Sequence, residues 1–251
     1  MSLVVVLVEP AGPLNVGSVA RLCANFGVAQ LRLVAPRCDH LGAEARLMAV
    51  HGAAMLEQAG LYPDLAAAVA DCRRVVATSG RLERESLPLS DAATGLGWLQ
   101  AGAGSSGDAP PRALVFGRED SGLTNDELLQ AGRVVRLSTS EAYASLNLSH
   151  AVAICLHELQ QLERPGPAAA LHSSAPATAA AEPSGRADLE AALADAEALL
   201  LEVGFLYPHT AHARMAKLRA LLQRAEITEA EVALLRGMVR QLRWAATRQT
   251  P

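Results

Sequence analysis

Five short runs of mostly branched apolar residues recur within the first 140 residues, and they constrain the fold more than any other feature of the sequence. Such runs are typical of strands buried on both faces of a parallel sheet, because the helices that connect parallel strands cover both of its sides. The segments between the runs carry turn residues or apolar residues at helical spacing. We therefore predict an α/β domain, a parallel sheet flanked by helices, with strands at 3–8, 31–34, 74–77, 113–116 and 133–137.

Helices are predicted where apolar residues recur with the period of a helix. Thr124 is placed to cap a helix that begins at Asn125. The segment 100–112 has no periodicity and is rich in Gly, Ser and Pro, so we expect a surface loop there. The other predicted helices of this part of the chain are 19–26, 41–55, 65–72 and 147–163.

The chain changes character after Glu163. Residues 164–186 contain four prolines among Ala, Ser and Gly, so we expect a flexible linker that buries little apolar surface. A small helical C-terminal extension follows, and Thr228 to Glu231 fits a capping box that opens its last helix. We expect this extension to be too thin for a core of its own and to pack on the main domain or on a second copy. The predicted parts are a domain at 1–163, the linker 164–186 and the extension 187–251, with helices at 187–203, 215–222 and 229–247.

The formal net charge of -4 conceals an uneven distribution. Residues 1–163 hold 12 arginines and 17 acidic side chains, whereas residues 207–251 hold eight basic and three acidic ones. A basic helical tail either contacts RNA phosphates or is an ordinary solvated helix face. The sequence leaves both interpretations open.

The four cysteines, Cys23, Cys38, Cys72 and Cys155, are far apart in the sequence. No two have the short spacing of a zinc or redox site, so we expect no metal and interpret them as buried thiols in a reducing compartment. The apolar run 3–8 is too short to span a bilayer and follows no charged leader. These features predict a soluble cytoplasmic protein without a membrane partner.

Polar loops that contain glycine or hydroxyl side chains follow three predicted strands, at 78–81, 117–122 and 138–147. Ligands of open parallel sheets bind at the carboxyl ends of the strands, so these loops should converge on one site. Glycine lets a nucleotide-like ligand approach the backbone closely. The alternative for the third loop is that Ser145 and Asn147 only cap the next helix, which is a common use of these residues.

The two best-known nucleotide-binding fingerprints do not occur. Residues 12–17 read Gly-Pro-Leu-Asn-Val-Gly, which lacks the Gly-x-Gly-x-x-Gly spacing of a dinucleotide site. A Gly-Lys-Ser or Gly-Lys-Thr phosphate loop is also missing from the sequence. Nicotinamide and ATP chemistry are therefore not expected.

Three groups of residues resemble, in order and spacing, the three motifs of a known enzyme family. The first group is Asn15, Gly17 and Arg21, the second is Phe-Gly-Arg-Glu-Asp-Ser-Gly-Leu at 116–123, and the third is Ser-Leu-Asn-Leu at 145–148. They resemble the motifs of the 2'-O-ribose RNA methyltransferases of the SPOUT superfamily, and within its TrmH family they are most similar to the TrmJ branch. The resemblance covers residues 3–160, and the linker and helical extension are also similar to that branch.

The resemblance implies a domain whose C-terminal stretch threads a loop to form a deep trefoil knot, an exception to the usual unknotted chain. It also implies S-adenosylmethionine bound in the knot and a homodimer in which each site borrows from the partner. Arg21 matches the catalytic arginine, surrounded by the motif residues Asn15, Glu119, Ser145 and Asn147. The residues that match the cofactor pocket are Thr78, Ser79, Gly80, Gly117, Leu137, Ala144, Ser145 and Leu146.

The implied activity is methyl transfer to the ribose 2'-hydroxyl of tRNA, at cytidine or uridine 32 at the edge of the anticodon loop, and no DNA partner is expected. Arg21 either activates the hydroxyl or, because a guanidinium is hardly ever neutral, stabilises the developing alkoxide. The departures from the family pattern are mild: Pro10 and Pro13 flank the first loop, and Ala144 replaces a second serine. The alternatives are methylation of another tRNA or rRNA site, a non-catalytic RNA-binding dimer of the same fold, and a nucleotide-dependent oxidoreductase, which the missing fingerprint disfavours.

Overall fold

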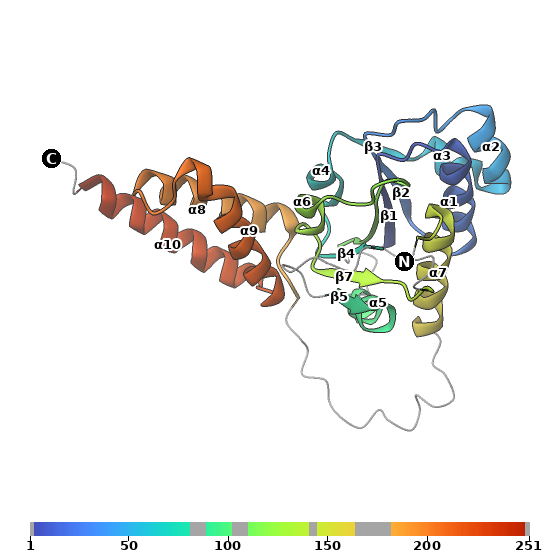
Figure 1. Cartoon of the computed structure of the whole chain (residues 1–251). Helices are drawn as coiled ribbons and strands as arrows, with labels where there is room; N and C mark the ends of the chain where they lie inside the picture. The colour runs from blue at the N-terminus through green and yellow to red at the C-terminus, as the bar shows by residue number, and fades with distance from the viewer. Residues whose placement is uncertain (1–2, 81–88, 102–109, 141–144, 164–181, 249–251) are drawn as a thin grey trace, which may run out of the picture. The chain divides into compact units, whose positions relative to one another are not determined.

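The computed structural model describes residues 3–80, 89–101, 110–140, 145–163 and 182–248 (Figure 1). The chain forms two compact units, residues 1–180 and 181–251. Across these described residues, no helix combines the length and the apolar character needed to cross a membrane.

The first unit is built on a seven-stranded sheet in which every described strand pair is parallel. The strand order is β3-β2-β1-β6-β4-β7-β5, with β6 in the centre between β1 and β4. Because neighbouring parallel strands end at the same edge, the loops after β6, β4 and β7 emerge side by side. The strands are β1 Leu3–Val8, β2 Gln30–Val34, β3 Gly60–Tyr62, β4 Arg74–Thr78, β5 Leu89–Asp91, β6 Arg112–Phe116 and β7 Arg133–Arg136.

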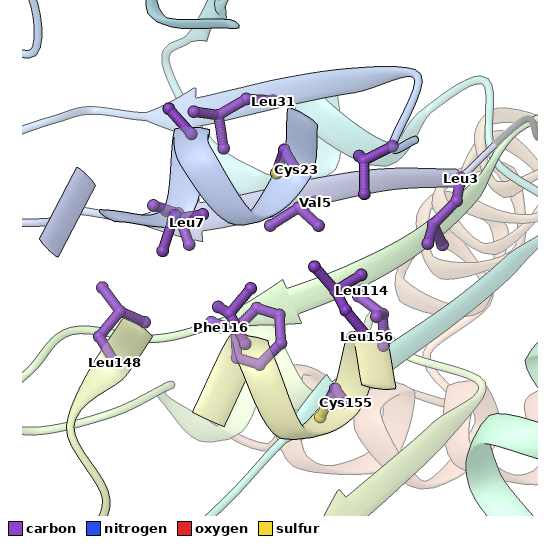
Figure 2. Packing of buried hydrophobic residues seen from close by; sticks show 14 of the residues in the cluster. Leu3, Val5, Leu7, Cys23, Leu31, Leu114, Phe116, Leu148, Cys155 and Leu156 are labelled. Atoms are coloured by element: carbon purple, nitrogen blue, oxygen red, sulfur yellow. The ribbon is translucent and has the colours of Figure 1, made fainter. Parts of the chain in front are cut away.

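Helices cover both faces of the sheet, and the strands supply buried side chains to the two faces in alternation. The odd-numbered residues of β1 pack in the cluster that contains α1, α2, α3, α5 and α7, and the even-numbered ones pack with α4 and α6. This is the two-residue period of a strand buried on both sides. In the first cluster, side chains of β1 and β6 meet Cys23 of α1 and Cys155 of α7 (Figure 2). The helices are α1 Pro13–Asn25, α2 Ala43–Ala49, η1 Val50–Gly52, α3 Ala53–Glu57, α4 Leu65–Val69, α5 Ala92–Ala101, α6 Asn125–Leu128 and α7 Leu148–Glu163.

Two glycines let α1 lie in direct backbone contact with the segment that follows β2. A Cβ atom on Gly17 would lie 2.1 Å from the carbonyl oxygen of Ala45, and one on Gly52 would lie 2.9 Å from that of Ala20. Any side chain at either position would push the elements apart. The contact therefore fixes α1, the helix that carries the first motif.

The parallel sheet flanked by helices is confirmed, but some elements differ from the prediction. The two edge strands, β3 and β5, were not predicted, because each has only three residues and none of the six is buried. The single helix predicted at 41–55 is wrong. Val50 adopts a φ of 50°, which ends α2 and turns the chain so that Gly52 meets α1. The predicted cap at Thr124 is confirmed at α6, where Glu127 also completes a capping box.

The second unit consists of three helices with a core of their own, α8 Arg186–Glu202, α9 Pro208–Arg224 and α10 Glu229–Arg248. The capping box at its last helix is confirmed: the N–H of Glu231 donates to Oγ1 of Thr228 at 3.3 Å, and the N–H of Thr228 donates to Oε2 of Glu231 at 2.7 Å. The expectation that this extension is too thin for a core is wrong, because residues of the connecting turns complete one. The buried cluster comprises Leu189, Ala192, Leu193, Leu206, Ala211, Met215, Ile227 and Val232.

Most of the predicted linker, residues 164–181, lies outside the described residues. Its last residues belong to the second unit: Ser184 is buried and donates its N–H to the carbonyl oxygen of Ile227 at 2.8 Å, and Arg186 begins α8. The domain boundaries 1–163 and 187–251 stay a prediction.

Candidate active site

A pocket opens at the carboxyl edge of the sheet, where β4, β6 and β7 end. Its volume of about 360 Å³ lies in the range of small-molecule sites. The loops after the three strands and the first turn of α7 all contribute, so the three polar loops converge. The lining residues are Thr78, Ser79, Gly80, Phe116, Gly117, Glu119, Asp120, Ser121, Gly122, Leu123, Leu137, Ser145, Leu146, Leu148 and Ala151.

Every described residue that was expected to hold the cofactor is part of this lining, and Ala144 lies outside the described residues. Phe116, Leu123, Leu148 and Ala151 lie outside the three predicted loops and were not expected there. Phe116 is the last residue of a buried strand, so its position at the strand end was the available signal. Leu148 and Ala151 are three residues apart on α7 and therefore share one helix face. This spacing was the available signal that both line the same pocket.

The loop after β6 is a tight turn that requires glycine at two positions. Gly122 has a φ of 70°, and a Cβ atom on Gly117 would lie 2.3 Å from the carbonyl carbon of Gly122. Arg118 and Gly122 exchange two backbone hydrogen bonds, of 3.3 and 3.0 Å, across the turn. The turn therefore closes on itself and leaves Glu119, Asp120 and Ser121 at the pocket.

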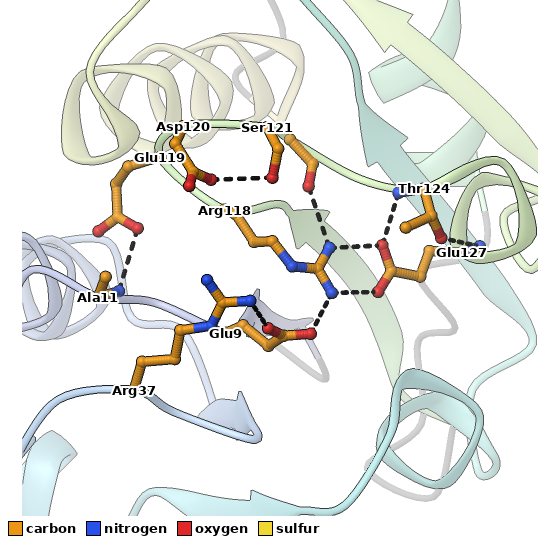
Figure 3. A network of polar contacts seen from close by, with 10 residues as sticks. Glu9, Ala11, Arg37, Arg118, Glu119, Asp120, Ser121, Thr124 and Glu127 are labelled. Carbon is orange, nitrogen blue, oxygen red and sulfur yellow. Dashed lines mark hydrogen bonds and ion pairs between the residues drawn. The ribbon is translucent and has the colours of Figure 1, made fainter.

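Arg118 anchors the base of this turn (Figure 3). Its two terminal nitrogens each donate to the carboxylate of Glu127 at 3.0 Å, and one also bonds Glu9, which Arg37 contacts as well. The Arg118 bond holds the pKa of Glu9 below its usual value. Burial alone would raise the pKa of Glu127, but hydrogen bonds from Arg118 and Thr124 outweigh burial and lower it. The motif arginine thus ties the pocket loop to the end of β1 and to α6.

Glu119 connects the second motif to the first. Its Oε2 accepts the N–H of Ala11, and its Oε1 accepts the N–H of Gly12 and Nδ2 of Asn15, each at 3.1 Å. Burial would raise the pKa of this carboxyl group, but the hydrogen bonds from Ala11, Asn15 and Gly12 outweigh burial and lower it below 4.5. Glu119 is therefore an ionised acceptor at neutral pH, and it lacks the near-neutral pKa of a general acid or base.

Asn147 connects the third motif to the first. Its Nδ2 donates to Oδ1 of Asn15 at 3.0 Å. Its Oδ1 accepts the N–H and the hydroxyl of Ser149 at 2.9 and 2.8 Å, as expected of a residue that caps α7. Asn147 therefore caps α7, as the sequence allowed, and also bonds a side chain of the first motif. We call the hydrogen bonds that join Glu119, Asn15 and Asn147 the motif link, because it contains one residue of each motif.

Three of the expected site residues that the structure describes, Asn15, Arg21 and Asn147, do not line this pocket, and of these only Arg21 lies outside the motif link. Arg21 is exposed on α1, one helical turn beyond Gly17. Within the described part of the chain, its side chain has no hydrogen-bond or ion-pair partner. Its guanidinium is therefore available to a group from outside this chain.

None of the four cysteines is among the residues that line the described pocket, and three of the four are buried. Cys23, Cys72 and Cys155 are buried as expected, and burial raises the pKa of Cys23 and of Cys155 to about 12. The expectation is wrong for Cys38, which is only partly buried because it follows β2 in a surface loop. Burial, and then the charge of Glu119, raise the pKa of Cys38.

Comparison with known proteins matches both units. The SpoU rRNA Methylase family model matches residues 2–157, and the model of the tRNA methyltransferase TrmJ C-terminal domain matches residues 187–251. The tRNA (cytidine/uridine/adenosine-2'-O-)-methyltransferase TrmJ of Pseudomonas aeruginosa is 35% identical over 243 residues, which span 94% of this chain and 91% of that protein. The tRNA (cytidine/uridine-2'-O-)-methyltransferase TrmJ of Klebsiella pneumoniae is 34% identical over 242 residues, 94% of this chain and 93% of that protein.

Among solved structures, the crystal structure of TrmJ from Z. mobilis ZM4 superposes with a TM-score of 0.80 at 28% identity, covering 95% of this chain and 98% of that chain. The resemblance that the three motifs indicated is thus confirmed over nearly the whole sequence. The chain belongs to the SpoU methylase family, in its TrmJ branch.

Proposed function

We propose that this protein transfers the methyl group of S-adenosylmethionine to the ribose 2'-hydroxyl of a cytidine or uridine in tRNA, at position 32 of the anticodon loop. The observation that carries the proposal is the motif link beside the pocket, which joins the three motif loops into one polar site. The names of the Pseudomonas and Klebsiella relatives support tRNA as the substrate. The Pseudomonas relative is also named for adenosine, so the test includes every base.

The residues around the pocket suit S-adenosylmethionine. Phe116, Leu137 and Leu148 offer apolar surface to a purine ring, and the carboxylates of Glu119 and Asp120 complement a positively charged ligand. The bound cofactor supplies a methyl group on a positively charged sulfur. The residues that we assign to holding it are Thr78, Ser79, Gly80, Gly117, Leu137, Ala144, Ser145 and Leu146.

Arg21 is assigned to the ribose 2'-oxygen. Because a guanidinium is hardly ever neutral, its role is to stabilise the negative charge that grows on this oxygen as its proton passes to solvent, and not to accept the proton. Asn15, Glu119 and Asn147 keep the three loops in register through the motif link, and the Ser145 hydroxyl orients the ribose. Such positioning supplies much of the acceleration when two reactants must be aligned and water excluded.

We also propose a homodimer in which Arg21 completes the site of the partner subunit. Arg21 is exposed and lies outside the pocket of its own chain. Apolar side chains of α1 and of the α2–η1 segment are exposed in the same chain: Leu14 by 50%, Leu47 by 74% and Val50 by 48%. Exposed apolar surface of this kind is typical of an interface.

The deep trefoil knot is the third part of the proposal. The residues after β4 and those between β7 and α7 line one pocket, as expected if the second segment passes through a loop formed by the first. A crystal structure traced through residues 78–91 and 137–148 tests the threading. An unthreaded path would contradict the knot and leave the reaction unaffected.

Mass-spectrometric mapping of ribose methylation in a tRNA pool, incubated with the protein and S-adenosylmethionine, tests the activity. We expect 2'-O-methylation of cytidine or uridine 32. Methylation at another tRNA position, or of rRNA alone, would contradict the assigned position. Binding of tRNA without methylation would instead support a non-catalytic RNA-binding dimer. Calorimetry with S-adenosylhomocysteine and with NAD tests the pocket, and binding of NAD alone would overturn the cofactor assignment.

A further inference from the structure

The last helix, α10, presents three different faces. One packs in the core of the second unit through Val232. A second carries Leu234, Met238 and Leu242 at four-residue spacing, each more than half exposed. The third carries arginines and an exposed tryptophan at the same spacing: Arg236, Arg240, Trp244 and Arg248. The charged face and the apolar face are therefore separate surfaces.

The charged face borders a groove between α8 and α10 with a volume of about 700 Å³. Arg236, Arg240, Arg243 and Trp244 of α10 line it, and α8 contributes Asp195. We call it the α8–α10 groove. A concave surface with several guanidinium groups and one aromatic ring combines the features of sites for single-stranded nucleic acid.

Acidic residues of α8 hold two of the arginines in place without neutralising the groove. Arg236 contacts the carboxylate of Asp195 at 3.7 Å, and Arg243 contacts that of Glu202 at 3.6 Å. Arg243 also donates to the carbonyl oxygen of Asp195 at 3.2 Å. In the described part of the chain Arg240 has no such partner. The groove therefore carries net positive charge, with Arg240 available for a phosphate.

Trp244 is suited to stack on a planar ligand. It is 50% exposed at the groove, although the guanidinium carbon of Arg248 lies 4.1 Å from the centroid of its ring. An exposed tryptophan costs free energy in water, and a nucleobase that stacks on it removes part of that cost. A base stacked there would also place its phosphates within the field of Arg240 and Arg248.

We propose that the α8–α10 groove binds an unpaired nucleotide of the RNA substrate, with its base on Trp244 and a neighbouring phosphate at Arg240. The inference rests on the proposed function, because it assigns part of the recognition of that same RNA to the second unit. Stacking requires a base that is not already paired, so the groove distinguishes a folded RNA with looped-out bases from a plain duplex.

The fluorescence of Trp244 tests the contact in the full chain. The chain has two tryptophans, so a Trp98→Phe background leaves Trp244 as the reporter. Titration uses an unmodified tRNA transcript and, separately, a blunt RNA duplex of equal nucleotide length. We expect quenching by the tRNA and little quenching by the duplex. Equal quenching by both would overturn the proposal.

Binding constants of variants provide the second measurement. Trp244→Leu is expected to raise the Kd for the tRNA about tenfold and to leave the Kd for the duplex unchanged. Arg240→Gln is expected to reduce the slope of log Kd against log salt by about 1, the change that the loss of one phosphate contact produces. Arg224 is an exposed arginine of α9, and the matched control Arg224→Gln is expected to leave the slope unchanged. Thermal melting of each variant verifies that the second unit is folded.

The remaining outcomes are also decisive. An unchanged tRNA Kd for folded Trp244→Leu would contradict the stacking role. A change in oligomeric mass on the same substitution would show that the groove is an interface between copies, and would overturn the RNA assignment. Because these experiments measure binding without S-adenosylmethionine, their failure is distinct from a failure of methyl transfer by the wild-type protein.

Discussion

Two motif arginines, Arg118 and Arg21, have opposite surroundings although the same family pattern contains both. The Arg118 side chain is 12% exposed and bonds two carboxylates and a carbonyl oxygen. Arg21 is exposed and has no partner among the described residues. Arg118 is thus committed to holding its own loop, whereas Arg21 is free to meet the substrate.

Arg21→Ala is expected to lower the rate of methyl transfer by about 10²–10³-fold, the usual loss when one group that stabilises transition-state charge is removed. The affinity for S-adenosylhomocysteine should stay unchanged, because Arg21 does not line the pocket. Single-turnover kinetics and calorimetry measure the two quantities. Arg21→Lys, which retains the charge, should recover part of the rate. A wild-type rate in Arg21→Ala would contradict the assignment.

The lowered pKa values of three carboxyl groups in and around the loop after β6 predict that the protein loses stability in acid. The pKa values of Glu9, Glu119 and Glu127 are lower in the folded protein than the ordinary value of 4.5. The folded state therefore binds fewer protons, so their stabilisation is present above about pH 4.5 and is lost as the pH falls through the lowered pKa values. We expect Tm to fall over this range, and to fall less steeply in Glu127→Gln. Parallel Tm profiles for the two proteins would refute this role for Glu127.

At the level of elements, close contact between α1 and α2 depends on glycine. Gly17→Ala is expected to destabilise the first unit by about 1–3 kcal/mol, because its new Cβ meets the carbonyl oxygen of Ala45 and the elements must separate. Gly97→Ala is the matched control: no atom lies within 4 Å of a Cβ at Gly97 of α5, so this change should stabilise by about 0.5–1 kcal/mol. Calorimetric melting of both variants measures the difference, and equal Tm values would contradict this packing argument.

The elements also show which parts of the fold were readable from the sequence. Strands such as β1 and β6 were predicted because apolar residues occupy every position of β1 and all but the first position of β6, as in strands covered on both faces. β3 and β5 could not be predicted, because three residues that pair at an exposed sheet edge carry no apolar pattern. The end of α2 at Val50 was equally hidden, because the positive φ there is imposed by tertiary contact of Gly52 with α1.

The candidate site, like the fold, could be predicted only in part from the sequence. Parallel strands end at one edge of the sheet, so the sequence predicted that the three loops after them converge. This convergence predicted that the described residues assigned to the cofactor pocket lie near one another. The partners of the motif side chains did not follow from the sequence. Nothing in the spacing indicates that Glu119 bonds Asn15 while the adjacent Arg118 bonds Glu9 and Glu127, because these pairs are set by the direction of each side chain in the turn.

At the level of the whole molecule, the proposed dimer makes a prediction about mixed subunits. In Gly117→Ala, the new Cβ meets the Gly122 backbone and distorts the turn that lines the pocket. A mixture of Arg21→Ala chains with Gly117→Ala chains is expected to recover activity that each variant alone has largely lost. Only a mixed dimer has an intact pocket facing an intact Arg21 from the other chain. Methyl transfer after co-expression measures the recovery. An inactive mixture of verified heterodimers would mean that Arg21 serves its own chain.

Asn147 follows directly after Ser145 and Leu146 of the pocket lining, and it reaches out of the pocket to Asn15 on the helix that carries Arg21. Asn147 thus connects the loop that forms one wall of the cofactor site to the helix that carries Arg21. An occupant of the pocket that shifts this wall changes the position of α1 relative to α7. Thermodynamic reciprocity then requires that RNA bound at α1 change the cofactor affinity by the same factor as the cofactor changes the RNA affinity, with the 3.0 Å hydrogen bond from Asn147 to Asn15 as the connection.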